Sequence, residues 1–399
     1  MHSTLGQSRD AAVVIVGAGP AGLVLGNLLH AANIDCIIIE RQSRAHLEKR
    51  ARAGLLAANS VRILVDNGLA EGLNAHGRQH DTCVIRGDHG QFELKYSTLG
   101  RGEIHTVYPQ QNLVADLIAE FLNRGGDLRF DTAVVAMHDI ETEQPWLTCR
   151  NVDGSEYRLT GSYLAGCDGP YGVSRRFLPS TVRRYRRDHG VRWLAVLAQA
   201  PPSMAAVTYA LHERGFAGHM PRDETVTRYY LQVPPSEVPR EWTDQRIWAE
   251  LGVRMRTDEY GPLRQGSILE KRIVDMTSEV HDPIRHGRLF VVGDAASLIS
   301  PAAAKGANLA IMAAHTLATA MIDASNQGDQ RALARYSSDC LSRIWRAQEF
   351  SHWLINLLHS PADNTEDAVF RRELQRARLT SLRNSQTYQD WFAENYVGI

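Results

Sequence analysis

One stretch decides the fold of this chain: Val13-Val14-Ile15-Val16-Gly17-Ala18-Gly19-Pro20-Ala21-Gly22. Its first four residues are β-branched and predict a buried parallel strand. Three glycines follow at the G-x-G-x-x-G spacing, which allows a tight turn, a close approach of a pyrophosphate to the backbone, and packing of the next helix on the strand. The positive N-terminus of that helix would face the phosphates. The stretch predicts a dinucleotide site, and its alternative is a glycine-rich turn without a ligand.

The segment after the first helix makes this prediction more specific. Ile37-Ile38-Ile39-Glu40 predicts a second buried strand with an acid at its tip. That acid is placed to accept hydrogen bonds from a ribose diol. A strand, a glycine turn, a helix and a closing acid together are much stronger evidence for a dinucleotide site than the glycine spacing alone. These residues leave open which dinucleotide is bound.

Composition narrows the class of protein. The 399 residues suggest two or three domains or one large interlocked unit. Lys and Arg number 44 and Asp and Glu 45, and this balance argues against nucleic acid or an acidic membrane as a partner. Five scattered cysteines without a C-x-x-C pair predict reduced, mostly structural thiols, and no metal site is expected. Glycines and a proline interrupt the uncharged run 11–29, so a cytoplasmic location is expected instead of a membrane span or signal peptide.

The segment 41–54 is strongly basic. It carries Arg41, Arg44, Lys49, Arg50 and Arg52 directly after the predicted ribose-binding acid. It could form an anion site for a second nucleotide or a substrate carboxylate, or it could be a solvated helical face. Of these five, Arg52 is the better functional candidate because an Ala-Gly pair follows it.

Further elements are predicted along the chain. A helix is expected over 109–124, beginning at a proline and ending at Gly125-Gly126. The segments 128–130, 133–137 and 146–150 predict a small antiparallel meander. A long amphipathic helix over 330–358 is a candidate dimer interface, and the aromatic tail 391–397 is expected to dock.

Two more motifs combine a strand with an acid. Tyr163 to Gly169 predicts a strand that ends in the Asp168-Gly169 turn, and 174–176 would open the next helix. The region 193–233 is rich in strands and predicts a second, sheet-based domain. A third strand then runs into Gly293-Asp294, which can place a carboxylate beside a polyol chain. A plain strand-to-helix turn is the alternative at this motif.

With its G-x-G-x-x-G turn at 17–22, Asp168-Gly169 and Gly293-Asp294, the chain resembles the single-component, class A FAD-dependent aromatic hydroxylases. The resemblance runs from Val13 to Val397. It implies an α/β (α+β overall) fold in three parts: a Rossmann-like FAD-binding domain over 1–184, a β-rich substrate domain over 185–298, and a helical C-terminal region over 299–399 that forms a homodimer interface. A small segment near 80–108 would contribute to the substrate side.

The resemblance also implies a reaction. In this family NADPH or NADH reduces a tightly but non-covalently bound FAD. The reduced flavin forms a C4a-hydroperoxide with O2, and its distal oxygen is transferred to a ring carbon ortho to a phenol. The expected substrate is a para-substituted benzoate, with 4-hydroxybenzoate giving 3,4-dihydroxybenzoate. Three alternatives stay open: an amino or further substituted analogue, a non-oxygenating FAD reductase of the same fold, and a flavin-binding protein with a regulatory role.

Residues around the cofactors follow from the same resemblance. The glycines would hold the pyrophosphate, Glu40 the adenosine ribose and Asp294 the ribityl chain, and Arg228 would help govern the movement of the flavin. The residues assigned to FAD are Gly17, Gly19, Gly22, Glu40, Arg52, Gln110, Asp168, Arg228, Asp294, Lys305, Gly306, Ala307 and Asn308. The residues assigned to the nicotinamide nucleotide are Arg41, Gln42, Arg50 and Arg175.

The remaining assignments concern the aromatic substrate. Tyr209 would touch its hydroxyl, Tyr396 would pass the proton on, and His80 would exchange it with solvent. The backbone carbonyl of Pro301 would orient the substrate oxygen. Arg222 and Tyr230 would hold the carboxylate. Without the resemblance, packing would be the favoured role of both Tyr209 and Tyr396.

Four departures from the family pattern stand out. Met220 replaces a serine beside the carboxylate arginine, and it cannot donate a hydrogen bond. The flavin loop reads Pro301-Ala302-Ala303-Ala304-Lys305-Gly306 where Pro-Thr-Gly-Ala-Lys-Gly is usual. His46 and Tyr171 replace a tyrosine and a histidine at nucleotide positions. The sequence therefore leaves open the ring substituents of the substrate and the choice between NADPH and NADH.

Overall fold

The computed structural model describes residues 10–50, 54–88, 90–359 and 365–398. The predicted strand, turn and helix form as β1 (Asp10–Val16) and α1 (Pro20–Ala31). β1 pairs in parallel with β11 (Glu156–Gly166) on one side and β2 (Cys36–Ile39) on the other. Neighbours at the two edges of this sheet are β18 (Leu289–Val291), β17 (Arg285–His286) and β8 (Asp127–Arg129).

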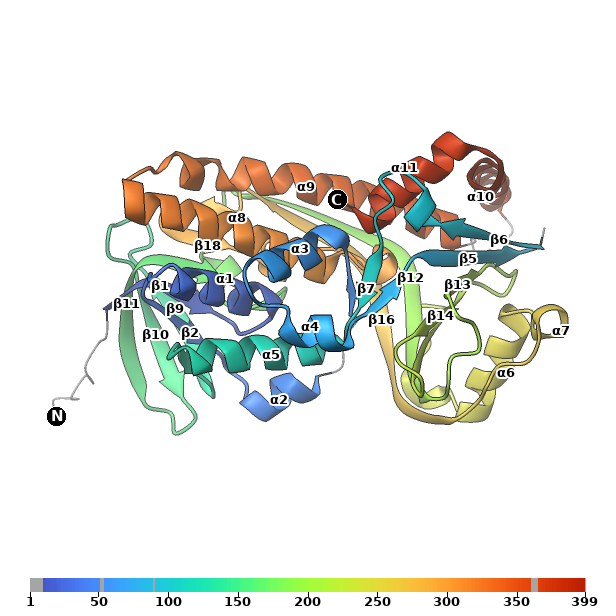
Figure 1. Cartoon of the computed structure of the whole chain (residues 1–399), viewed down its shortest axis with the longest axis horizontal. Helices are drawn as coiled ribbons and strands as arrows, with labels where there is room; N and C mark the ends of the chain where they lie inside the picture. The colour runs from blue at the N-terminus through green and yellow to red at the C-terminus, as the bar shows by residue number, and fades with distance from the viewer. Residues whose placement is uncertain (1–9, 51–53, 89, 360–364, 399) are drawn as a thin grey trace.

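The strands of this first sheet are apolar on both faces, so both faces must be covered. Helices cover one of them. Val14 and Ile15 are fully buried, as parallel strands between two layers require. α1 packs against both α5 (Gln110–Asn123) and α8 (Gly306–Gln327), as Figure 1 shows. α5 confirms the helix predicted over 109–124, and Gly125 follows it at a φ of +84°.

The predicted antiparallel meander is partly wrong. β9 (Thr132–His138) and β10 (Trp146–Asn151) do pair antiparallel with each other and with β11. β8, however, pairs in parallel with β2 and belongs to the main sheet. The chain leaves β2, crosses through α5 and returns beside β2, and this crossover covers the outer edge of an apolar strand.

The second sheet carries the substrate side. Its strands lie in the order β19 (Ser297–Leu298), β16 (Ser267–Asp282), β12 (Arg183–Gln199), β15 (Thr227–Val233), β14 (Ala217–Pro221), β13 (Val207–Ala210), β5 (Thr82–Gly87), β6 (Gly90–Lys95). β12 and β16 form a long ribbon that joins the two halves of the molecule (Figure 1). The second sheet thus uses strands from within 1–184, while β17 and β18 of the segment 185–298 lie in the first sheet.

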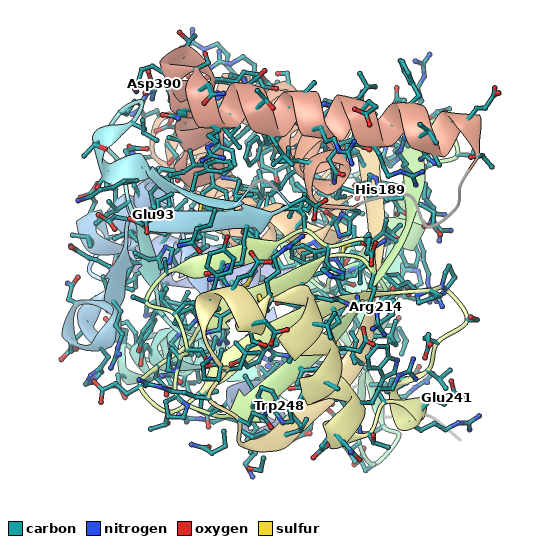
Figure 2. The ribbon with its side chains drawn as sticks, turned by 90° about the vertical axis from the view of Figure 1, so that its right-hand side faces the viewer. Glu93, His189, Arg214, Glu241, Trp248 and Asp390 are labelled. Atoms are coloured by element: carbon teal, nitrogen blue, oxygen red, sulfur yellow. The ribbon has the colours of Figure 1, made fainter. Side chains whose placement is uncertain are left out.

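One face of the second sheet is closed by α6 (Asp244–Arg254), and α7 (Thr257–Tyr260) follows it. Trp248 of α6, labelled in Figure 2, contacts Tyr229 of β15 at 5.4 Å between ring centroids. Because strand residues alternate, Tyr230 points to the opposite face. There its ring lies 4.7 Å from that of Trp193. The second face therefore turns toward the C-terminal helices and the small third sheet.

The third sheet consists of β3 (Leu55–Leu56), β7 (His105–Val107) and β4 (Arg78–His80). Short helices α2 (Arg44–Lys49), α3 (Ala58–Asp66) and α4 (Glu71–His76) flank it in the chain. The helix predicted to open at 174–176 is only a 3₁₀ turn over Ser174–Phe177. Pro179 lies two residues beyond this turn, and the residue before a proline disfavours helix.

The C-terminal part is helical, as predicted, with α9 (Arg331–Leu358), α10 (Glu366–Asn384) and α11 (Gln386–Val397). α9 confirms the long helix, but Leu333, Tyr336 and Leu354 are fully buried within this chain. Much of its apolar face is therefore core, and Trp345 is the large apolar residue that stays exposed. Within the described ranges no helix is long and apolar enough to cross a membrane.

Candidate active site

A cleft of about 1660 Å³ lies between the glycine turn of the first sheet and the β12–β16 ribbon. Its lining includes Gly17, Gly19, Glu40, Asp168 and Asp294. A site for one small molecule or cofactor usually measures about 300–1,000 Å³. The cleft therefore has room for a dinucleotide and a further ligand.

The glycine turn fits a pyrophosphate. Gly17 has a φ of +104°, and a Cβ there would lie 2.6 Å from the carbonyl oxygen of Cys167. A Cβ on Gly22 would lie 2.0 Å from the carbonyl oxygen of Gly17. A Cβ on Gly19 would meet no protein atom within 4 Å. Gly17 and Gly22 thus build the turn, while Gly19 leaves open space beside the N-terminus of α1.

The acids of the three predicted motifs converge on this cleft. Glu40 accepts hydrogen bonds from the backbone N–H groups of Ala18 and Gln42, both at 2.8 Å. Asp168 accepts one from Ser174 N–H at 2.9 Å, while its other oxygen, Oδ1, is buried without a partner. Burial raises the pKa of Asp168. An orphaned carboxylate oxygen in a dinucleotide cleft fits a ligand hydroxyl.

The predicted FAD residues at Gln110 and around the start of α8 divide into two groups. Gln110, Gly306 and Ala307 line the cleft. Lys305 instead is 1% exposed and donates to the carbonyl oxygens of Tyr396 at 2.8 Å and Gly398 at 2.7 Å. The side chain of Asn308 bonds Ala57 N–H and two carbonyl oxygens, those of Leu55 and Ala304. Both side chains therefore hold protein segments in place.

The predicted nucleotide residues line the same cleft. Arg41, Gln42 and Arg50 line the cleft, together with His46 and Tyr171. Arg52 lies outside the described residues. Arg175 also lines the cleft, but it bonds the carbonyl oxygen of Pro170 and forms an ion pair with Glu279. No pattern in the sequence indicates that the buried carboxylate of Glu279 engages this arginine.

The two predicted catalytic tyrosines meet. The hydroxyls of Tyr209 on β13 and Tyr396 on α11 lie 2.7 Å apart, and both residues are at most 2% exposed. Burial raises the pKa of each phenol. Two linked hydroxyls shielded from bulk water can pass a proton without exchanging it with solvent.

His80 does not bond Tyr396 directly. Its Nε2 accepts a hydrogen bond from Val207 N–H at 3.0 Å, and its Nδ1 bonds the Tyr96 hydroxyl. Since Nε2 is an acceptor, the ring is neutral with its proton on Nδ1. Burial lowers the pKa of His80 to about 4, which agrees with a neutral ring. His80 is 9% exposed, so it is mostly buried but not sealed, and its proton exchange with solvent stays a prediction.

Sequence reasoning missed two residues beside this pair, Tyr96 and His105. The Tyr96 ring packs edge-on against Tyr396 at 5.6 Å and His105 at 5.5 Å. His105 lies directly opposite His80 across β4 and β7, and its Nδ1 is buried without a partner. Burial holds the pKa of His105 well below its usual range. The pairing of two histidines across short strands could not be read from sequence spacing.

The substrate side is a row across three strands. Tyr209 on β13 lies opposite Gly218 on β14, which lies opposite Tyr230 on β15. Met220 is two residues beyond Gly218 and therefore on the same face. Tyr230 and Met220 both pack against the cluster that contains Tyr209. A Cβ on Gly218, a position also missed from the sequence, would lie 3.0 Å from the Phe216 ring and 3.5 Å from that of Tyr230, so glycine keeps room for these rings.

Positive charge lies at the end of this row. Arg222 follows β14, and burial lowers its pKa, as does the charge of Arg228. Arg228 lies opposite Met220, is 4% exposed, and has its Nη1 buried without a hydrogen bond. Its nearest carboxylate is that of Glu270 at 3.9 Å. A buried guanidinium with an unpaired N–H group, beside a second arginine, favours an anionic ligand.

Pro301 stands where the cleft meets this sheet. It lines the cleft, and its neighbours Ala302 and Ala303 pack in the cluster that contains Tyr209 and Tyr396. Its carbonyl oxygen accepts a hydrogen bond from Ala304 N–H at 3.0 Å. A carbonyl oxygen has a second lone pair, so it can still accept a hydrogen bond from a substrate hydroxyl.

A dinucleotide cleft joined to a buried face with paired tyrosines and arginines is typical of FAD-dependent aromatic hydroxylases. The chain belongs to the FAD binding domain family, whose model matches residues 10–351. It is a flavoprotein aromatic monooxygenase with FAD as its cofactor. When bound, FAD supplies the redox chemistry and the oxygen activation that such a hydroxylation needs.

The comparisons with individual proteins agree on this class. The chain is 35% identical over 394 residues to p-hydroxybenzoate hydroxylase of Acinetobacter baylyi, covering 98% of this chain and 96% of the relative. The fold is similar to that of p-nitrophenol 4-monooxygenase from Pseudomonas putida, at a TM-score of 0.82 and 16% identity, covering 98% of this chain and 99% of that one. Anhydrotetracycline hydroxylase from Streptomyces rimosus aligns at a TM-score of 0.77 and 20% identity, covering 98% and 76%.

Proposed function

We propose that this chain hydroxylates 4-hydroxybenzoate to 3,4-dihydroxybenzoate, using NADPH or NADH and O2. The observation that carries the proposal is the buried hydrogen bond between the Tyr209 and Tyr396 hydroxyls. A phenol is a better nucleophile as its phenolate, so its hydroxylation requires a path for the phenolic proton. The 35% identity to p-hydroxybenzoate hydroxylase over nearly the whole chain supports the same substrate class.

Each residue has a role in this proposal. Arg222 and Tyr230 bind the carboxylate at one end of the ring. Tyr209 receives the proton of the para hydroxyl and passes its own proton to Tyr396, and Tyr396 passes its proton on toward His80, which exchanges it with solvent. The carbonyl oxygen of Pro301 orients the substrate oxygen. Gly17, Gly19, Gly22, Glu40 and Asp294 would hold FAD, and Arg41, Gln42 and Arg50 would bind the nicotinamide nucleotide. Lys305 and Asn308 hold the tail and β3 around the flavin.

The test is a screen of substituted benzoates on the FAD-loaded enzyme. Oxidation of NADPH or NADH should rise sharply with 4-hydroxybenzoate, and 3,4-dihydroxybenzoate should carry ¹⁸O from labelled O2. A benzoate that stimulates oxidation without labelled product would favour the non-oxygenating reductase. If 4-aminobenzoate gave labelled product and 4-hydroxybenzoate did not, the substrate would be the amino analogue. If no benzoate stimulated oxidation, the proposal would fail.

Met220 gives a first prediction. Met220→Ser restores a hydroxyl donor beside the predicted carboxylate clamp. One such hydrogen bond contributes about 1 kcal/mol, so the Kd for 4-hydroxybenzoate should fall about fivefold. The Kd can be measured from the change that the ligand causes in the flavin absorbance spectrum. Met204→Ser is the control, because Met204 packs against the cluster on the opposite face of the sheet. An unchanged Kd in Met220→Ser would remove Met220 from the clamp.

Tyr96 gives a second prediction. Tyr96→Phe removes the hydroxyl that bonds His80 and keeps the ring that packs on Tyr396. If Tyr96 continues the proton path toward His80, the ratio of hydroxylated product to oxidised nicotinamide should fall several-fold. FAD content and the rate of flavin reduction should stay at the wild-type level. Chromatographic product analysis under steady-state turnover measures the ratio, and an unchanged ratio would assign Tyr96 to packing.

The homodimer stays part of the proposal. Most apolar residues of α9 are buried within the chain, which leaves the exposed Trp345 as its main apolar contact for a second copy. Light scattering of wild type and Trp345→Ser would test it. A monomeric wild type, or a dimer that the substitution does not weaken, would exclude this interface.

A further inference from the structure

A strip of arginines on β12 lines the same cleft as the glycine turn. Arg184 and Arg186 line the cleft, and so does Arg192 beyond a bulge. The odd-numbered residues point the other way: Tyr185 packs on Trp345 of α9 at 5.2 Å, and His189 on His352 at 5.5 Å. His189 is labelled in Figure 2. Alternation along the strand therefore places Arg187 on the face opposite to Arg186.

One carboxylate, that of Glu279, lies among Arg184 and Arg186 of the strip and Arg175. Glu279 of β16 is 5% exposed and stands directly opposite Arg186. One of its oxygens bonds Arg184 at 2.6 Å and the other pairs with Arg175. Within the described residues, Arg186 has no ion-pair partner. Burial lowers the pKa of Arg175, and the neighbouring charges of Arg184 and Arg186 lower it further. Counting the acids Asp188, Asp275 and Glu279 against Arg175, Arg184, Arg186, Arg192 and Arg272, this part of the lining carries more positive than negative charge.

The same surplus extends over the whole cleft. Among its described lining residues, nine arginines and lysines face six carboxylates. Glu40 and Asp168 among these acids already accept backbone hydrogen bonds. Like charges this close repel each other unless an anion joins them. Guanidinium groups match phosphate oxygens through paired N–H donors, so the strip suits phosphate groups.

We propose that Arg184 and Arg186 form a subsite for the phosphate groups of the nicotinamide nucleotide. The inference rests on the proposed use of NADPH or NADH and adds residues that the family resemblance does not assign. None of the residues assigned to FAD lies on β12, so the strip stays available beside a bound FAD. The cleft is large enough for this second ligand beside FAD. Glu279 acts as a positioning residue because it forms ion pairs with both Arg175 and Arg184 and so holds them side by side.

The test uses ADP-ribose and 2′-phospho-ADP-ribose, which carry the phosphates but no redox-active ring. Their Kd values for the FAD-loaded enzyme are measured by titration calorimetry without an aromatic acid. Arg186→Gln should weaken binding about tenfold, since a hydrogen bond to a charged group is lost. The double variant R184Q/R186Q should weaken it further. Arg186 makes no ion pair in the described chain, so its substitution should leave the fold intact.

Arg187→Gln is the matched control, because it removes the same charge from the other face of the strand. Its Kd values should stay within twofold of wild type. A larger loss for the 2′-phosphorylated probe would locate the 2′-phosphate at the strip, and equal losses would locate the pyrophosphate there. The inference is overturned if wild type binds neither probe, if Arg186→Gln binds like wild type, or if Arg187→Gln loses as much. Failure of the benzoate screen would leave this result unaffected, and the reverse also holds.

Discussion

Tyr209→Phe is expected to lower the rate of aromatic hydroxylation by about 10²–10⁴-fold, the usual contribution of a positioned proton-transfer group. The Tyr209 hydroxyl lies 2.7 Å from that of Tyr396 and is sealed from solvent. Its removal leaves the substrate hydroxyl without its predicted proton acceptor. FAD binding and flavin reduction should persist, because Tyr209 does not line the dinucleotide cleft. Oxygen should then be lost as hydrogen peroxide.

Parallel assays of product, oxygen uptake and peroxide measure this outcome. Tyr336→Phe is the matched control, because Tyr336 is a fully buried tyrosine whose hydroxyl bonds the carbonyl oxygen of Val291 in a different core cluster. Its ratio of product to oxidised nicotinamide should equal that of wild type. Tyr396→Phe should behave like Tyr209→Phe. If Tyr209→Phe kept the wild-type ratio, the tyrosine pair would be a packing contact and the proton path would lie elsewhere.

The parts of the fold that were predictable depend on local signals. The β1–α1–β2 unit follows from a β-branched run, three glycines and an acid within 28 residues. α5 follows from a proline start, a glycine stop and a regular apolar period, and α9 follows from its apolar period. The meander failed in its first strand because the run at 128–130 fits a parallel or an antiparallel partner equally well. The pairing partner is β2, whose edge is open to a parallel strand and which lies far away in the sequence.

The parts of the site that were not predictable depend on contacts between distant residues. Lys305 lies beside the flavin loop in sequence, but its ammonium group bonds carbonyl oxygens 91 and 93 residues away. Glu279 meets Arg184 across 95 residues, and Asn308 meets Ala57 across 251. A buried polar side chain must find partners wherever the fold brings them. Sequence spacing gives the type of such a residue and not its partner.

Resemblance also hides what is particular to this chain. The resemblance assigns no role to Tyr96 or His105. Their place beside the tyrosine pair follows from the third sheet, in which His80 lies opposite His105, and from the bond between His80 and Tyr96. The β12 arginines likewise became meaningful only after strand alternation separated the cleft face from the α9 face. In both cases the decisive fact is which side of a strand a residue occupies. That follows from register, and register depends on pairing with a distant strand.

Gly22→Ala is expected to abolish FAD binding, and Gly19→Ala separates the two ways in which such a loss can arise. A Cβ at Gly22 would stand 2.0 Å from the carbonyl oxygen of Gly17, so the backbone of the turn must shift. The apoprotein of Gly22→Ala should therefore melt at a lower temperature than wild-type apoprotein. The purified variant should be colourless and should not regain the flavin spectrum with added FAD.

Gly19→Ala should leave the melting temperature of the apoprotein unchanged, because its Cβ meets no protein atom within 4 Å. A pyrophosphate that approaches this position would meet the new methyl group. Overpacking of this kind costs about 1–3 kcal/mol, which is roughly a 5-fold to 150-fold rise in the Kd for FAD. Thermal melting of the apoprotein and fluorescence titration with FAD provide both measurements. If Gly19→Ala bound FAD as wild type does, the pyrophosphate would not pass beside Gly19, and the glycines would serve only the strand-to-helix turn.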